Sequence, residues 1–333
     1  MDKTNLSDLL RNAGCDFNGV AIAQTASGTQ WEHIAGLADR EKLTPNRLKT
    51  SFQIASISKQ FAAAAVLLLQ EESRLNVGDA VSLWIPNCPD DWAGITLHHL
   101  LTHTSGIGHW GDYPHLSLFT ANAPAEVVRT IQNGTLVAKP GSRWSYSSPA
   151  YVLVSHVVEL ASKRPYCEFL REAIFEPLKM AHTRAGQRPA EASRESVGYY
   201  RGAPVPSFEL DTVGIGAGDV WSTARDMTLW DRSLLTGALL SPESIRQMFT
   251  PFASARAERD HSIAVGYGYG WFIEPVSGHR VAHHLGGNAG FVAFNAVALD
   301  DNVSLVMLSN DECFAMEPAG VRIMGALLDG ALD

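Results

Sequence analysis

The feature that most constrains the fold is an apolar run from Phe61 to Leu69, directly preceded by a polar cluster that contains Ser56 and Lys59. The run is long enough for about three turns of helix and is apolar on every side, which predicts a helix buried in the core. A lysine is almost never buried unless it is paired or has a chemical role. The polar residues at the head of this helix therefore need an explanation.

The spacing of Ser56 and Lys59 offers a chemical one. Residues three apart lie on one face of a helix, about one turn apart. Desolvation lowers the pKa of a lysine, whose amine can then accept or relay the proton of a neighbouring serine. The helix N-terminus adds N–H groups that suit a developing oxyanion. From this stretch alone, a first-turn serine beside a solvated lysine remains the alternative.

Composition narrows the class of protein. The chain has 333 residues, of which 46% are hydrophobic and 18% charged, as in a globular protein with a large core. This length suits one large domain or two interleaved ones. The formal net charge is −9 and no block of lysine and arginine occurs, which argues against nucleic-acid or membrane partners.

Cysteines and apolar runs bear on the compartment. The four cysteines, Cys15, Cys88, Cys167 and Cys313, lie far apart without a C-x-x-C pair and do not indicate a disulfide framework. The N-terminus lacks a basic segment followed by a long apolar one, and no apolar run could span a bilayer. We therefore expect a cytoplasmic protein; its oligomeric state is left open.

The order of elements predicts an α/β (α+β) architecture. Residues 4–14 form an amphipathic helix, and residues 19–24 and 31–38 a β-hairpin. Further helices are expected at 95–103, 123–134, 149–164 and 166–178, strands at 266–275, 279–287, 290–300 and 302–310, and a final helix at 315–332. The late strands should pair antiparallel because they are close in sequence. We expect an antiparallel sheet subdomain from residues 1–73 and 211–333, flanked by the N- and C-terminal helices, with a helical insertion at 74–210.

Two later stretches accompany the S-x-x-K of Ser56 and Lys59. One is PGSRWSYSSPAYVLV, with Tyr146 and Ser148, and the other is VAHHLGGNAGFVAF, with His284 and Gly286. In this order the three motifs resemble those of the serine β-lactamase and penicillin-binding-protein family, especially its class C β-lactamase and esterase branch. ITLHHLLTHTSGI and GYGYGWF also match that branch, and the resemblance covers most of residues 20–310. It implies a β-lactamase/transpeptidase-like fold with the active site in a cleft between the two subdomains.

The resemblance also implies roles. Ser56 would be the nucleophile of an acyl-enzyme, and Lys59 would hold its neighbours in their reactive protonation state. Tyr146 would be the general base, with its pKa lowered by the Lys59 ammonium. His284 would lie on an edge strand and face the site.

Binding groups follow from the same resemblance. The backbone N–H groups of Ser56 and Gly287 would form an oxyanion hole, and Ser148, Gly286 and Asn288 would contact the substrate. The absence of a side chain at both glycines would allow close approach. No metal or organic cofactor is implied, and the partner is a small ester or amide.

The sequence departs from the family at two positions. Ser148 stands where the family has asparagine, and a hydroxyl lacks the paired donor and acceptor that grip a substrate amide. His284 stands where a lysine is common, and imidazole is mostly neutral near pH 7. Both departures favour a carboxylesterase with acyl-transfer activity. The alternatives are a D-amino-acid peptidase or amidase, a weak β-lactamase, and an inactive binding or sensor protein on the same fold.

The sequence argues against two other hydrolytic chemistries. His98, His99 and His103 crowd one segment, but Leu100 stands where a zinc protease of the H-E-x-x-H type needs glutamate. Loop-ordering histidines are the preferred interpretation. An α/β-hydrolase is excluded because G-x-S-x-G does not occur.

Overall fold

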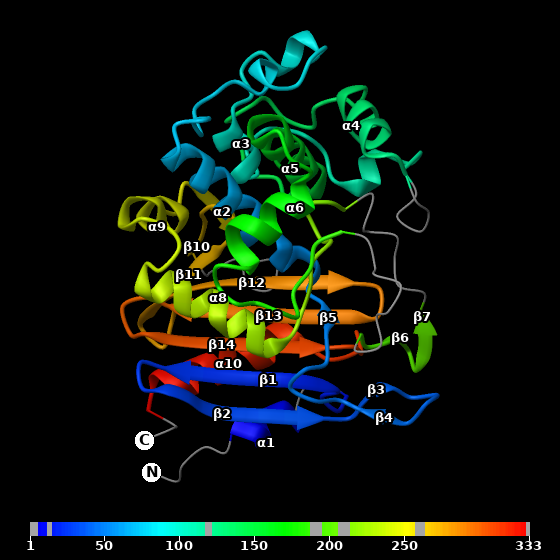
Figure 1. Ribbon diagram of the computed structural model, residues 1–333, viewed down its shortest axis with the longest axis vertical. Helices are drawn as coiled ribbons and strands as arrows, with labels where there is room; N and C mark the ends of the chain where they lie inside the picture. Colours follow the sequence, from blue (N-terminus) through cyan, green and yellow to red (C-terminus); the bar gives the residue numbers. More distant parts are fainter. Residues whose placement is uncertain are drawn as a thin grey trace.

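The computed structural model describes residues 6–11, 15–116, 122–186, 195–205, 214–256 and 264–330. Its centre is an eight-stranded sheet in the order β2-β1-β14-β13-β12-β11-β10-β9, in which neighbouring strands are antiparallel (Figure 1). In chain order the strands are β1 (Gly19–Thr25), β2 (Gly28–Ala35), β9 (Ala253–Arg256), β10 (Ala264–Tyr267), β11 (Phe272–Val276), β12 (His279–Asn288), β13 (Phe291–Ala298) and β14 (Val303–Ser309). The first hairpin of the chain therefore pairs with its last strand.

Both faces of the sheet are covered, which explains why the central strands are apolar throughout. In β1, Val20 and Ile22 belong to one core cluster, and Ala21 and Ala23 to the other. Successive side chains of a strand point to opposite faces, so this alternation assigns one cluster to each face. Each face requires a layer of helices to exclude water.

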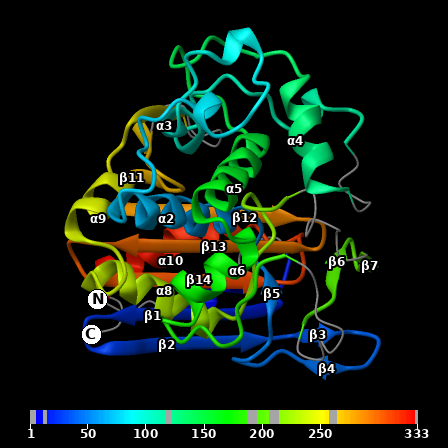
Figure 2. The same ribbon diagram turned by 45° about the horizontal axis from the view of Figure 1, so that its top comes forward.

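Different helices supply the two layers. The chain-terminal helices α1 (Leu6–Arg11) and α10 (Met316–Leu328) pack against each other, and α10 lies behind the sheet in Figures 1 and 2. On the opposite face, α8 (Ala224–Thr236) packs against β1 and β14. The short helix α9 (Pro242–Met248) follows α8 and contacts α2.

Helix α2 (Ser58–Glu71) is the apolar segment that the sequence singles out. Phe61 to Leu67 are fully buried, and α2 lies between the sheet and the helices drawn above it in Figure 1. A one-turn 3-10 helix, η1 (Ala55–Ile57), leads into it and packs against β12 and β13. This position joins the sheet to the helical part of the molecule.

The helical part consists of short elements around one long helix. The long one is α5 (Ser148–Ser162), which packs on α2. Around it lie α3 (Leu97–Leu101), α4 (Pro124–Gln132), α6 (Tyr166–Leu170), the π-helical turn η5 (Arg171–Phe175) and the 3-10 turns η2 (Val81–Leu83), η3 (Asp90–Trp92) and η4 (Trp110–Asp112). Three small strand pairs complete the described chain: β3 (Leu37–Asp39) with β4 (Thr44–Pro45), β5 (Phe52–Gln53) with β8 (Trp221–Ser222), and β6 (Gly198–Tyr200) with β7 (Ala203–Val205).

The sequence-based fold class is confirmed, with local differences. The hairpin, the late antiparallel strands, α2, α5 and α10 lie where they were expected. The strand expected over 266–275 is instead two strands, β10 and β11, because Gly270 turns the chain at a φ of +80°. The segment predicted as a helical insertion also contains the β6–β7 hairpin.

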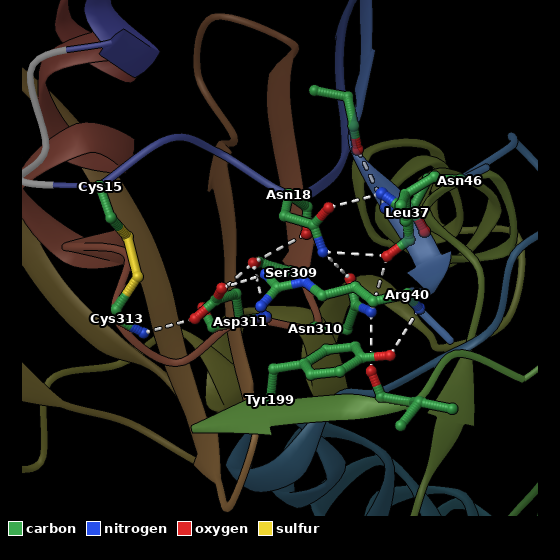
Figure 3. A network of polar contacts seen from close by, with 12 residues as sticks. Cys15, Asn18, Leu37, Arg40, Asn46, Tyr199, Ser309, Asn310, Asp311 and Cys313 are labelled. Atoms are coloured by element: carbon green, nitrogen blue, oxygen red, sulfur yellow. Dashed lines mark hydrogen bonds and ion pairs between the residues drawn. A yellow bond between two sulfur atoms is a disulfide. The ribbon is translucent and has the colours of Figure 1, made fainter. Parts of the chain in front are cut away.

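A disulfide between Cys15 and Cys313 joins the two ends of the chain, which the sequence did not indicate. Figure 3 places it beside a polar network around Asn18 and Asn310. In this network Asp311 forms an ion pair with Arg40 and accepts a hydrogen bond from the backbone of Cys313. A separation of 298 residues carries no local signal, because only the pairing of β1 with β14 brings the two cysteines together.

Within the described residues, no helix is both long and apolar enough to cross a membrane.

Candidate active site

Ser56 lies in η1, at the point where the chain enters α2. The residue before it, Ala55, is fully buried and has a φ of +49°, in the left-handed region that side chains other than glycine rarely adopt. Strain of this kind persists only where neighbours hold it, and here Ile54 N donates to Val220 O at 3.0 Å. Ser58 also joins the start of α2 to Val220, since its Oγ accepts a hydrogen bond from Val220 N at 3.0 Å. Ser56 itself is partly exposed.

Lys59 lies one turn further along, with no exposed surface. Its Nζ donates to Ser56 Oγ at 3.0 Å and to Ala217 O at 2.8 Å. Burial lowers the pKa of Lys59 from 10.5 to about 7, although the nearby Asp219 carboxylate opposes the shift. The ammonium and the free amine are therefore both populated near neutral pH, and the amine can take a proton from Ser56.

Tyr146 covers the same pair from the helical side. The Lys59 Nζ lies 5.0 Å from the centre of its ring. Burial raises the pKa of Tyr146, and hydrogen bonds with the side chains of Ser56 and Ser148 only partly offset this rise. The predicted lowering of this pKa by the Lys59 ammonium is therefore wrong in direction. Tyr146 is a neutral phenol that can pass a proton on.

A cleft of about 810 Å³ opens above these groups. Its walls come from the helical part on one side and from the ends of β12, β13 and β14 with the β6–β7 hairpin on the other. The residues that line it are Ser56, His109, Trp110, Tyr146, Ser148, Tyr200, Val205, Gly214, Ala217, Gly218, Gly287, Asn288, Ala289, Val292 and Glu312. Ser56 is thus reachable by a small molecule, whereas Lys59 does not line the cleft and has no exposed surface.

The two glycines of β12 differ in what surrounds them. A Cβ on Gly286 would lie 2.2 Å from Ile54 O, so this glycine allows β12 to approach η1. A Cβ on Gly287 would meet nothing within 4 Å, and Gly287 lines the cleft. Asn288 also lines the cleft and donates to Gly218 O at 3.3 Å. Gly286 was predicted to contact the substrate. It does not line the cleft, and it packs against the backbone of Ile54 instead.

Ser148 begins α5 and lines the cleft beside Tyr146. Its backbone N–H donates to His109 Nδ1 at 3.2 Å, which leaves the His109 proton on Nε2. The preceding residue, Ser147, caps the helix by accepting from Ala150 N and donates to Gly108 O. These contacts fix the N-terminus of α5, and with it Tyr146, against the loop that carries His109.

His284 lies behind the cleft rather than in its wall, with 1% of its surface exposed. The predicted edge position is wrong, because β12 lies between β13 and β11. The pairing of β12 with β11 nevertheless ends at His283. From His284 onward, no described strand pairs with this side of β12. The His284 ring centre is 6.2 Å from that of Tyr146, and burial lowers its pKa to about 3, with Lys59 adding to the shift. His284 is therefore neutral and offers a substrate no positive charge.

A chain of hydrogen bonds fixes the orientation of this histidine. His103 Nδ1 accepts from Ser147 N at 3.1 Å, so its Nε2–H donates to the Tyr267 hydroxyl at 3.1 Å. That hydroxyl lies 3.1 Å from His284 Nε2, and His284 Nδ1 lies 2.6 Å from Leu285 O. Each ring nitrogen thus has one defined role. His103 and Tyr267 were not identified as site residues from the sequence.

The three clustered histidines point to different partners. His98 Nδ1 contacts the Tyr269 hydroxyl at 2.8 Å, His99 takes part in capping α3, and His103 belongs to the chain just described. Among the described residues, no group of three metal-ligating side chains converges. Their roles here are in hydrogen bonding and packing.

The fold and this site define a serine hydrolase. A family model described as Beta-lactamase matches residues 8–322, and the chain belongs to this family. Penicillin-binding protein 4* of Bacillus subtilis is 30% identical over 89% of this chain and 68% of its own length. The putative penicillin-binding protein PbpX of the same organism is 29% identical over 92% of this chain and 73% of its own.

Solved structures with the same fold include both penicillin-binding proteins and amidases. A D-stereospecific amidohydrolase from Streptomyces sp. is 26% identical, with a TM-score of 0.79 over 97% of this chain and 98% of that one. The octameric penicillin-binding protein homologue from Pyrococcus abyssi has a TM-score of 0.84 at 24% identity, covering 93% of this chain and 73% of that one. D-amino acid amidase from Ochrobactrum anthropi SV3 reaches 0.84 at 22% identity, covering 98% and 99%.

Proposed function

We propose that this protein is a carboxylesterase that hydrolyses small esters through an acyl-enzyme on Ser56, with acyl transfer as a second outcome of the same intermediate. The observation that carries the proposal is the 3.0 Å contact between Lys59 Nζ and Ser56 Oγ at the floor of an open cleft. A buried amine with a pKa of about 7 is matched to proton transfer at neutral pH.

Acylation begins when the free amine of Lys59 takes the proton of Ser56 as its Oγ attacks the ester carbonyl. The carbonyl oxygen becomes negative and is stabilised by the backbone N–H groups of Ser56 and Gly287. The open surroundings of Gly287 support this assignment, since a side chain there would enter the cleft.

Breakdown of the tetrahedral intermediate requires a proton for the leaving alcohol. The Lys59 ammonium supplies it, and the Tyr146 phenol, hydrogen-bonded to Ser56, relays it. Water or a second alcohol then attacks the acyl-enzyme by the reverse route, which gives hydrolysis or transfer.

The cleft favours esters over carboxylate-bearing amides for two reasons. Ser148 supplies one hydroxyl where an amide side chain would both donate and accept. No lysine or arginine is among the described residues that line the cleft, and His284 is buried and neutral. A substrate carboxylate would therefore lose its hydration without gaining a cation.

A D-amino-acid amidase is the second candidate. Its support is the 26% identity to a D-stereospecific amidohydrolase over 97% of this chain. The same Ser56–Lys59 pair would serve both reactions, so only substrate preference separates them.

Covalent labelling tests the shared chemistry. A fluorophosphonate probe should modify Ser56, as read by intact mass and peptide mapping. Ser56→Ala should abolish labelling and lower ester hydrolysis by at least about 10³-fold, because the proposed acyl-enzyme forms on the Ser56 hydroxyl.

The matched control is Ser142→Ala, which removes an exposed hydroxyl outside the cleft lining and should change neither readout. Continued labelling of Ser56→Ala would overturn the assignment of the nucleophile. A panel of esters and D-amino-acid amides then separates the two candidates by their relative kcat/KM values.

A further inference from the structure

The described residues that line the cleft carry full charge of one sign. Among the described lining residues, Glu312 carries the one acidic side chain, and neither lysine nor arginine is present. His109 is the one histidine there, and burial together with the charge of Lys59 lowers its pKa, which keeps it neutral at pH 7. The described lining of the cleft therefore offers a ligand a single full charge, and it is negative.

Glu312 is held in place by its surroundings. Its Oε2 accepts a hydrogen bond from Gly290 N, in the turn between β12 and β13, and its own backbone N–H donates to Tyr199 O at 3.1 Å. The residues on either side are fixed as well, since Cys313 is bonded to Cys15 and Asp311 is paired with Arg40 (Figure 3). The carboxylate is thus part of a rigid wall.

The described residues around this carboxylate do not neutralise it. None of the ion pairs formed by the described residues includes Glu312, whereas the adjacent Asp311 is compensated by Arg40. Arg201 stacks on Tyr200, 5.1 Å from the ring centre, but it is exposed, so water and salt screen its charge. Apart from Tyr200 and Asn288, the other side chains of this wall are those of Val205, Ala289 and Val292, which are apolar and favour the alkyl part of a ligand.

The proposed mechanism indicates which part of a substrate reaches Glu312. The leaving alcohol must lie on the helical side, where Lys59 and Tyr146 supply its proton. This leaves for the acyl chain the opposite wall of the cleft, which is lined by Gly287, Asn288 and Glu312.

Resting on the proposed function, we propose that the preferred acyl donors carry a cationic group, an ammonium or guanidinium, at the far end of an alkyl chain, and that Glu312 determines this preference. The apolar wall takes the chain and the carboxylate takes the charge. Acyl groups that end in a carboxylate are rejected by the same residue.

The test compares two 4-nitrophenyl esters of equal shape. One has an ω-trimethylammonio-alkanoyl group, and the other has a tert-butyl group in place of the trimethylammonium, each made at short, medium and long chain lengths. At low salt and at the best-fitting length, wild type should prefer the cation by about 5- to 30-fold in kcat/KM, as expected for a partly screened charge pair. This preference should fall toward unity as salt is raised.

Variants separate Glu312 from the general charge of the protein. Glu312→Gln keeps an oxygen that can accept from Gly290 N but removes the charge, so the cation-to-neutral ratio should fall to near unity. Glu312→Lys should invert the ratio. Glu32→Gln removes an exposed carboxylate on β2, outside the cleft lining, and should leave the ratio as in wild type.

The ratio is read within each variant, so a general loss of activity does not affect it. Equal ratios in wild type and Glu312→Gln, or no preference at any chain length, overturn the inference while leaving ester hydrolysis intact. If Glu312→Gln does not fold, the inference is overturned when the cation-to-neutral ratio of wild type does not change with salt concentration. Failure of wild type to hydrolyse either ester or to label at Ser56 overturns the proposed function, and this inference with it.

Discussion

Two groups at the floor of the cleft are placed to remove the proton of Ser56, and burial acts on them in opposite directions. For Lys59 the charged form is the protonated one, so desolvation lowers the pKa to about 7. For Tyr146 the charged form is the deprotonated one, so desolvation raises the pKa. At neutral pH the free amine is abundant and the phenolate is not. In the proposed mechanism Lys59 is therefore the base in the free enzyme, and Tyr146 the relay.

This assignment predicts the pH dependence of acylation. With a neutral ester, kcat/KM should rise with pH along a single limb with an apparent pKa of about 7, because Lys59 acts only after losing its proton. Lys59→Met should lower acylation by at least about 10³-fold. The measurement is a pH–rate profile under conditions of low substrate.

Two variants control for other titrating groups. Tyr146→Phe should lower the rate without moving the limb, and His109→Gln should leave the limb near the same pH. A limb near pH 10 that is lost in Tyr146→Phe would assign the base to the phenolate of Tyr146 instead. A flat profile would exclude both groups.

At the scale of elements, the site depends on how closely β12 approaches η1. Gly286 faces the Ile54 carbonyl, and Gly287, the next residue, faces the open cleft. The two positions are adjacent in sequence and opposite in environment, because successive residues of a strand point to opposite sides. One glycine serves the packing of the protein and the other serves access to Ser56.

The pair Gly286→Ala and Gly287→Ala tests this division. A Cβ at 286 would lie 2.2 Å from Ile54 O, so we expect a loss of about 1 to 3 kcal/mol in the free energy of unfolding and slower labelling of Ser56. A Cβ at 287 meets nothing within 4 Å, so stability should stay within about 0.5 kcal/mol while ester hydrolysis slows. Urea unfolding and labelling rates give the two readouts. Equal stability of the two variants would contradict the packing role of Gly286.

Features of the fold and of the site that depend on residues close together in the sequence could be predicted, and features that depend on distant residues could not. The buried helix with Ser56 and Lys59 at its head was predictable because apolar runs and i, i+3 spacing are local. The strand pairing at the end of the chain was predictable for the same reason. The contact of His103 with Tyr267 was not, because it joins residues 164 apart without any pattern in the sequence between them. The direction of the Tyr146 pKa was missed because it depends on burial, which a motif does not reveal.

At the scale of the whole molecule, the Cys15–Cys313 disulfide closes nearly the full length of the chain. A cross-link that closes a long loop reduces the conformational freedom of the unfolded state. It also ties the segment before β1 to the loop after β14, two strands that already pair. The disulfide therefore reinforces a junction on which the sheet depends.

Breaking this bond should destabilise the protein without abolishing its fold. The double variant Cys15→Ser and Cys313→Ser, or wild type in reductant, should lose about 3 to 5 kcal/mol in urea unfolding. The matched control replaces the two cysteines outside the disulfide, Cys88 and Cys167, by serine and should not change the effect of reductant. Identical unfolding of oxidised and reduced wild type would show that the bond contributes nothing to stability.

The place of β1 between β2 and β14 also sets the order in which a ribosome can complete the molecule. The β1–β2 hairpin emerges first, yet the open edge of β1 waits for a strand that is translated near the end of the chain. Contacts of such long range close slowly, and an apolar edge left open in the meantime invites pairing with other chains. An apolar strand edge of the nascent chain therefore stays uncovered until β14 has been translated and pairs with β1.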